Sequence, residues 1–303
     1  MRAVVSLGTN TTRFLVIEEV PAGGVRVVDQ GSAGTRLGAG LRERGSLDPV
    51  AMERTLAAVA GFVARIRERG AEVSCIATSA MRRASNADAF AGGVEALTGV
   101  APTVLDGAEE AAASFAGATF GARSTGGRVA VLDIGGGSTE CAVGRAGEVE
   151  AAVSVEIGAV RLAEMFPETM GASPPDAARA AGALARSAAR EALTVLASFA
   201  GCSEVRAVGG SAMVIGALAN AVDVQSVAGT LLQRDDVDAL VHRLLGMGLS
   251  ARRALPGMLQ QRADIVPAGG MILSEALAGL GARAALLPGN DLLLGYLLQA
   301  GGG

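Results

Sequence analysis

The 303-residue chain contains no lysine, no tryptophan, one tyrosine and one histidine. Aromatic residues make up only 3% of it, which excludes the stacking platforms of proteins that bind single-stranded nucleic acid. The single histidine, His242, excludes a histidine-cluster metal site, and its apolar neighbours indicate a structural helix residue. All 26 cationic residues are arginines, so a bound anion must be held by guanidinium groups, backbone N–H groups or a metal ion.

The chain also lacks a long hydrophobic run and a disulfide pattern. No uninterrupted stretch reaches the roughly 18 apolar residues of a membrane span, and the apolar N-terminal run is too short for a signal peptide. Three cysteines without a Cys-x-x-Cys pair, Cys75, Cys141 and Cys202, are typical of reduced thiols. A formal net charge of −4 argues against a general nucleic-acid binder. We therefore expect a cytoplasmic protein with neither nucleic acid nor a membrane as partner.

The residues that are present indicate two α/β domains. Half of them are apolar, enough for real cores, and the length predicts about two domains. Apolar strands over residues 3–7 and 128–134 each run into a small polar turn and a further strand, so a pattern at Ser6 recurs 127 residues later at Asp133. Helices are predicted over residues 49–70, 109–120 and 177–199. We expect domains of roughly 1–120 and 121–303, divided near Gly126-Gly127.

The strongest local chemical signal is the stretch from Asp133 to Glu140, which encloses Gly135, Gly136 and Gly137. A glycine turn after a strand exposes its N–H groups and can cradle a phosphate. The two flanking acids offer the oxygen ligands that Mg²⁺ prefers. The alternative is a plain glycine hairpin with incidental acids, and a plain strand–helix turn is the better interpretation of Gly209-Gly210-Ser211 taken alone.

Other candidate residues have two local interpretations each. Glu109 and Glu110 open an Ala-rich helix, where they either favour the first turn electrostatically or supply a general base for water. Arg82 and Arg262 lie near turns, where solvated surface arginine is the default.

Eight stretches, in order along nearly the whole chain, resemble motifs of the exopolyphosphatase / guanosine pentaphosphate (pppGpp) phosphohydrolase family. That family belongs to the actin, sugar kinase and heat-shock chaperone superfamily, and the likeness is to its short two-domain form. The stretches are Ser6–Arg13, Thr35–Leu41, Ala77–Arg82, Gly107–Ala111, Asp133–Glu140, Gly158–Leu162, Val208–Ala212 and Arg262–Asp264.

The resemblance implies an α/β fold of two actin-like (ribonuclease H-like) domains around a central cleft. We also expect the C-terminal helix to pack back on the first domain. It implies that Glu110 is the general base and that Asp133 and Glu140 lie beside a metal, Mg²⁺ or alternatively Mn²⁺. The implied phosphate-binding residues are Gly8, Thr9, Asn10, Arg13, Arg82, Gly135, Gly136, Gly137, Ser138, Gly209, Gly210, Ser211 and Arg262.

Two departures from the family pattern affect the charge of the site. Ser6 stands where the first phosphate loop normally starts with aspartate, and Leu293 and Leu294 replace a usual Arg-Glu pair. We expect an exopolyphosphatase that releases terminal orthophosphate from inorganic polyphosphate. The alternatives are a pppGpp 5′-phosphohydrolase and, because of Ser6, a catalytically weak phosphate or alarmone sensor. The sequence does not decide the oligomeric state, and a homodimer is one possibility.

Overall fold

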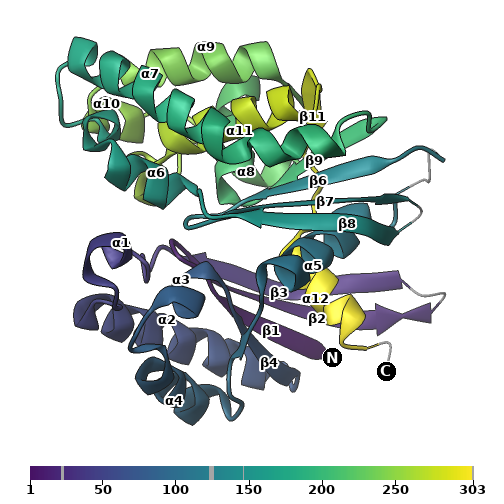
Figure 1. Ribbon diagram of the computed structural model, residues 1–303. Helices are drawn as coiled ribbons and strands as arrows, with labels where there is room; N and C mark the ends of the chain where they lie inside the picture. Colours follow the sequence, from purple (N-terminus) through teal and green to yellow (C-terminus); the bar gives the residue numbers. More distant parts are fainter. Residues whose placement is uncertain (22–23, 123–125, 146, 302–303) are drawn as a thin grey trace.

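The computed structural model describes residues 1–21, 24–122, 126–145 and 147–301. Two sheets lie one above the other, each covered by helices on its outer side (Figure 1). The α/β class predicted from the sequence is confirmed, with one sheet in each half of the chain. The division into domains at residue 120 stays a prediction.

The first sheet has five strands and the second has six. The first runs in the order β3 (Gly24–Ala33), β2 (Thr12–Val20), β1 (Arg2–Leu7), β4 (Glu72–Ala77) and β5 (Thr103–Val104). The second runs in the order β10 (Leu231–Gln233), β11 (Ala284–Leu286), β9 (Glu204–Val208), β6 (Val129–Ile134), β7 (Thr139–Arg145) and β8 (Glu148–Val155). In each sheet a hairpin is joined to a strand that runs parallel to its first arm, β4 beside β1 and β9 beside β6.

The two hairpins repeat each other in register. Ser6 pairs with Arg13 across β1 and β2, and Asp133 pairs with Glu140 across β6 and β7. Each turn is closed by one backbone hydrogen bond, from Gly8 N to Thr11 O at 3.2 Å and from Gly135 N to Ser138 O at 3.0 Å. All of these positions differ by the 127 residues that separate Ser6 from Asp133 in the sequence. The structure therefore contains the duplicated strand–turn–strand unit that the sequence predicts.

The outer helices follow from their capping and periodicity. Helix α2 (Pro49–Glu68) begins at Asp48, whose carboxylate accepts hydrogen bonds from the N–H groups of Val50 and Ala51. It buries Val59, among others, against the first sheet, beside α4 (Ala87–Thr98). The remaining helices outside the central layer are α1 (Leu41–Arg44), α3 (Ser79–Arg83), α6 (Ala159–Met165), α7 (Pro175–Ala192), α8 (Gly210–Asn220), α9 (Arg234–Leu245), α10 (Leu249–Arg253) and α11 (Val266–Gly279), with 3-10 turns at Pro167–Met170, Leu193–Phe199, Val224–Ser226 and Gln260–Arg262.

One predicted helix is shorter than expected. The α-helical part of the 177–199 segment ends at Ala192 and continues as 3-10 helix over Leu193–Phe199. Thr194 and Val195 are β-branched, which disfavours the α-helical conformation. The hydroxyl of Thr194 also donates to the Glu191 carbonyl at 2.9 Å, at the point where the helix tightens.

Helices α5 (Gly107–Thr119) and α12 (Leu292–Gln299) fill the layer between the sheets (Figure 1). Phe115 of α5 packs on the second sheet, whereas Leu293 of α12 packs on the first. The two helices touch at Gly295, where a Cβ would lie 1.7 Å from the Ala113 carbonyl oxygen, so no side chain fits there. Each helix thus covers the sheet of the other half of the chain. In the described part of the chain, no helix combines the length and apolar character needed to cross a bilayer.

Candidate active site

A pocket lies between the turns of the two hairpins, at the edge where the parallel strands of both sheets end. Thr78 and Ser79 follow β4 and line it beside the first turn, and Gly209 and Gly210 follow β9 and line it beside the second. Its other lining residues are Ser6, Gly8, Thr9, Asn10, Thr11, Arg13, Glu110, Asp133, Ile134, Gly135, Gly136, Gly137, Ser138, Arg262 and Leu292.

Most of the predicted site residues therefore meet in one pocket, and three do not line it. Arg82 and Glu140 lie behind Glu110, and Ser211 is buried in the first turn of α8. The roles assigned to all of these residues remain predictions.

Sequence reasoning named Thr78 and Ser79 only as part of a motif and did not assign them to the site. The sequence does offer a signal, because Thr78 and Ser79 directly follow the apolar residues of β4, and the carboxyl ends of parallel strands meet at one edge of a sheet. Thr11 was likewise missed as a site residue, although it lies inside the first turn.

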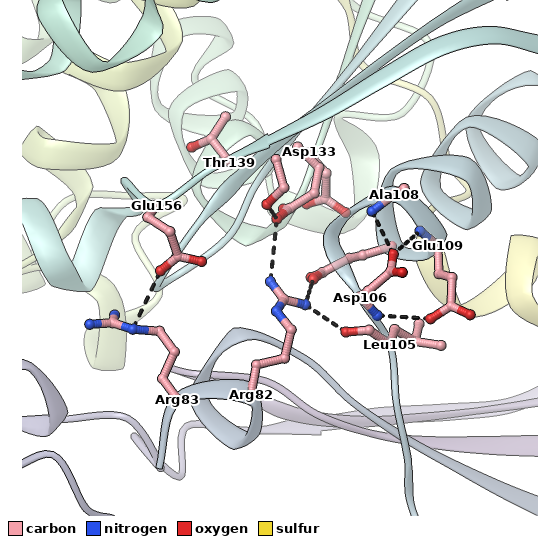
Figure 2. Close-up of polar contacts among 12 residues, drawn as sticks. Arg82, Arg83, Leu105, Asp106, Ala108, Glu109, Asp133, Thr139 and Glu156 are labelled. Carbon is pink, nitrogen blue, oxygen red and sulfur yellow. Dashed lines mark hydrogen bonds and ion pairs between the residues drawn. The ribbon is translucent and has the colours of Figure 1, made fainter. Parts of the chain in front are cut away.

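Two adjacent glutamates at the start of α5 have different surroundings, and Figure 2 labels the first of them, Glu109. Asp106 caps the helix by accepting from the N–H groups of Ala108 and Glu109, and the Glu109 carboxylate accepts from Asp106 N at 2.8 Å. Glu109 is thus engaged in a capping box. Glu110 is only 6% exposed and faces the pocket. Of the two acids, Glu110 is the one placed to contact a bound molecule.

Burial raises the pKa of Glu110 to about 7. The hydrogen bond from Arg82 opposes this rise, while the nearby charge of Asp133 adds to it. The pKa of Asp133 is also raised by burial, and that of Glu140 is raised well above its usual value by burial and by Glu110 and Asp133. Three carboxyl groups thus crowd one buried region, an arrangement that a cation would stabilise.

The guanidinium group of Arg82 contacts two carboxylates and one backbone carbonyl. Its Nη1 donates to the Leu105 carbonyl at 2.8 Å and to Glu110 Oε2 at 2.7 Å (Figure 2). Its Nη2 lies 3.8 Å from Glu140 Oε1 and has no hydrogen-bond partner among the described residues. The guanidinium therefore bridges two carboxylates, and its geometry fixes the orientation of Glu110.

The residues present fit a hard divalent cation such as Mg²⁺. Asp133 lines the pocket, with one carboxylate oxygen accepting from Ser114 at 2.6 Å. The Oδ1 atom of Asn10 and the Oε2 atom of Glu140 are buried oxygens without a hydrogen-bond partner among the described residues, which calls for a water or an ion nearby. In the part of the chain that the structure describes, no group of three or more His, Cys, Asp or Glu side chains is arranged to hold a metal ion without other ligands. Mg²⁺ is typically held by one or two carboxylates together with substrate phosphates and water.

Two arginines line the pocket, and their charges are compensated to different degrees. Arg13 pairs with Asp291, the N-cap of α12. Arg262 donates to the neutral Thr11 hydroxyl at 2.8 Å, and its pKa is lowered to about 10 by burial and by the nearby charges of Arg13 and Arg36. An anion in the pocket would relieve this repulsion.

Two glycine turns facing each other, a buried glutamate and flanking arginines define a phosphate-handling protein, and sequence comparison gives the family. The sequence model of the Ppx/GppA phosphatase family matches residues 16–289. The chain belongs to this family, whose members generally depend on a divalent metal.

Individual relatives agree with this assignment. Exopolyphosphatase 2 of Mycobacterium tuberculosis is 33% identical over 99% of this chain and 98% of its own length. A guanosine-5′-triphosphate,3′-diphosphate pyrophosphatase of Vibrio vulnificus is 33% identical over 54% of this chain and 33% of its own length. The crystal structure of an exopolyphosphatase-like protein superposes with a TM-score of 0.88 at 27% identity, covering 99% of this chain and 98% of the other.

Proposed function

We propose that this protein is an exopolyphosphatase, which hydrolyses the terminal phosphoanhydride bond of inorganic polyphosphate and releases orthophosphate. One observation carries the proposal. The carboxylate of Glu110, with its pKa raised to about 7, faces the same pocket as the two glycine turns. The end-to-end similarity to a relative named exopolyphosphatase 2 supports it.

In the proposed reaction the terminal phosphate lies between the turns at Gly8 and Gly135, where backbone N–H groups bind its oxygens. Glu110 accepts a proton from a water molecule as the water oxygen attacks the terminal phosphorus. The bond from that phosphorus to the bridging oxygen breaks, and the shortened chain leaves with the bridging oxygen. Arg13 and Arg262 stabilise the charge that develops on the phosphate oxygens. Arg82 holds Glu110 in position.

We propose Mg²⁺ as the metal, with Mn²⁺ as the alternative. Asp133 would hold the ion from the pocket wall, and Glu140 would add negative charge behind it. When bound, the ion would neutralise charge on the phosphates. Ser6 would contribute a neutral hydroxyl where the family has an acid, so the metal is held with one charge less.

A second candidate is a pppGpp 5′-phosphohydrolase, favoured by the similarity of about half of the chain to guanosine-5′-triphosphate,3′-diphosphate pyrophosphatases. Both substrates end in a phosphoanhydride and would meet the same turns. A catalytically weak sensor is favoured only by Ser6. We further propose a cytoplasmic location, which the absence of disulfides at Cys75, Cys141 and Cys202 supports.

Orthophosphate release from long-chain polyphosphate and from pppGpp, assayed side by side with Mg²⁺, tests the proposal. The expected result is a higher kcat/KM for polyphosphate. A higher kcat/KM for pppGpp would transfer the activity to the second candidate. Tight binding of either compound without release of phosphate would establish the sensor.

A further inference from the structure

A second pocket opens beside the first and shares Thr9, Ser79 and Gly137 with it. It lies between the two halves of the chain, because its walls come from residues before 84 and after 136. Its remaining lining residues are Gly38, Leu41, Arg42, Ala80, Arg83, Val160, Arg161 and Glu164. Three of them are arginines, and none of these described lining residues is aromatic.

The arginines come from three separate short helices, each attached to one of the turns that form the first pocket. The N–H groups of Val160 and Arg161 both donate to the Gly136 carbonyl, at 2.9 and 3.1 Å. A Cβ on Gly158 would lie 2.5 Å from the Gly136 carbonyl carbon, so α6 packs on that turn without an intervening side chain. The position of Arg161 is thereby fixed relative to the second turn.

The other two arginines are attached in a similar way. Arg42 follows a loop in which Gly38 N donates to the Thr9 carbonyl at 2.9 Å, at the first turn. Arg83 ends α3, whose first residue, Ser79, lines both pockets. Contacts with the turns therefore hold the backbones that carry the three arginines beside the first pocket.

Nearby carboxylates compensate only part of the positive charge of Arg42, Arg83 and Arg161. Glu156 lies 3.4 Å from Arg83 and 2.9 Å from Arg161, and it is half exposed (Figure 2). Glu164 accepts from Gly40 N at 2.7 Å. Two carboxylates thus face three guanidinium groups. Burial and the charges of Arg83 and Arg42 lower the pKa of Arg161, which indicates that its charge is not fully compensated.

We propose that the second pocket is a binding subsite for the distal phosphates of a linear polyphosphate, those beyond the three that tripolyphosphate would place in the first pocket. The inference rests on the proposed function of the first pocket. A linear polyphosphate carries charge along its whole length, and guanidinium groups bind phosphate oxygens in a bidentate manner. A nucleoside would find no aromatic ring here to stack on. Arg42, Arg83 and Arg161 would therefore select for phosphate chain length.

Chain-length dependence tests the subsite. Arg83→Ala and Arg161→Ala are compared with the wild type on long-chain polyphosphate and on tripolyphosphate. Since a hydrogen bond to a charged group contributes about 1.5–3 kcal/mol, the KM for the long chain should rise about tenfold or more for each variant. The kcat should be unchanged, and the KM for tripolyphosphate should change by less than about threefold. An equal rise for both substrates, or no rise for the long chain, would overturn the subsite.

Two further variants sharpen the test. Glu156→Gln frees Arg83 and Arg161 from their acid partner and should lower the KM for the long chain. Arg243→Ala removes an exposed arginine from α9, in the outer layer, and should leave the KM for both substrates unchanged. A lowered affinity in Glu156→Gln would contradict the charge argument.

Direct binding separates failure of the subsite from failure of the proposed function. If the wild type hydrolyses neither substrate, the proposed function is wrong. Calorimetric titration of long-chain polyphosphate into folded wild type and into an R83A/R161A double variant still tests the subsite. Affinity lost in the double variant supports it, and equal affinity overturns it. Circular dichroism with thermal unfolding establishes that the double variant is folded.

Discussion

Ser6 and Asp133 occupy the same position in the two hairpins, each at the end of the first strand and each lining the pocket. Their cross-strand partners are Arg13 and Glu140, which also correspond to each other. The duplicated unit therefore brings a neutral hydroxyl and a carboxylate to one pocket. The charge difference between these two equivalent positions leads to the first two predictions.

Ser6→Asp should raise activity at limiting Mg²⁺ and change little at saturating Mg²⁺. The added carboxylate strengthens attraction for the cation, and Mg²⁺ sites depend on one or two such groups together with phosphates. Titration of activity against Mg²⁺ concentration measures the effect. A fall in activity at every Mg²⁺ concentration would show that the site has adapted to the hydroxyl and would favour the sensor.

Asp133→Asn should raise the Mg²⁺ concentration needed for half activity by about tenfold or more and lower the maximum rate, as expected for loss of a charged metal-side group. The same titration measures it, with Asp176→Asn on the exposed start of α7 as the control. An unchanged Mg²⁺ dependence would mean that Asp133 only shapes the turn.

The kcat should rise with pH along a limb centred near 7, because Glu110 must be ionised to accept a proton and its pKa is about 7. Arg82→Ala should shift that limb to higher pH, because the hydrogen bond from Arg82 lowers the pKa of Glu110. A pH series of initial rates checks both shifts. A limb that persists in Glu110→Gln would assign the titration to another group.

The raised pKa of Glu110 also makes the stability of the folded protein depend on pH. The pKa of Glu110 is raised above its usual 4.5, so the folded protein binds this proton more tightly than the unfolded chain. Its contribution to stability is present below pH 4.5 and is lost as pH rises through about 7. Metal-free wild type should therefore lose more thermal stability between pH 5 and pH 8 than Glu110→Gln does, and an equal loss would contradict the assignment.

Local chemistry made the two turns predictable, whereas distant pairings could not be predicted. Glycines after an apolar strand specify a tight turn from a few neighbouring residues, so Gly8 and Gly135 could be placed from the sequence. The contact between Arg13 and Asp291 joins residues 278 positions apart, and no local periodicity encodes it. Arg36 and Asp264 likewise meet at 2.7 Å across the two halves of the chain.

The different surroundings of Glu109 and Glu110 depend on both kinds of information. The capping box of Glu109 is local and follows from Asp106 three residues earlier. The burial of Glu110 and its hydrogen bond with Arg82 depend on the packing of segments that are separate in the sequence. Two adjacent acids with the same local pattern could therefore be told apart only after the chain had folded.

Orthophosphate release from long-chain polyphosphate by Glu110→Gln and Glu109→Gln, beside the wild type at saturating Mg²⁺, tests the central claim most directly. Glu110→Gln should lose about 10²–10⁴-fold in kcat, the usual contribution of a general base, with substrate affinity retained. Glu109→Gln should keep its kcat, since it weakens only a helix cap. A large loss in Glu109→Gln with little loss in Glu110→Gln, or equally small losses in both, would contradict the account.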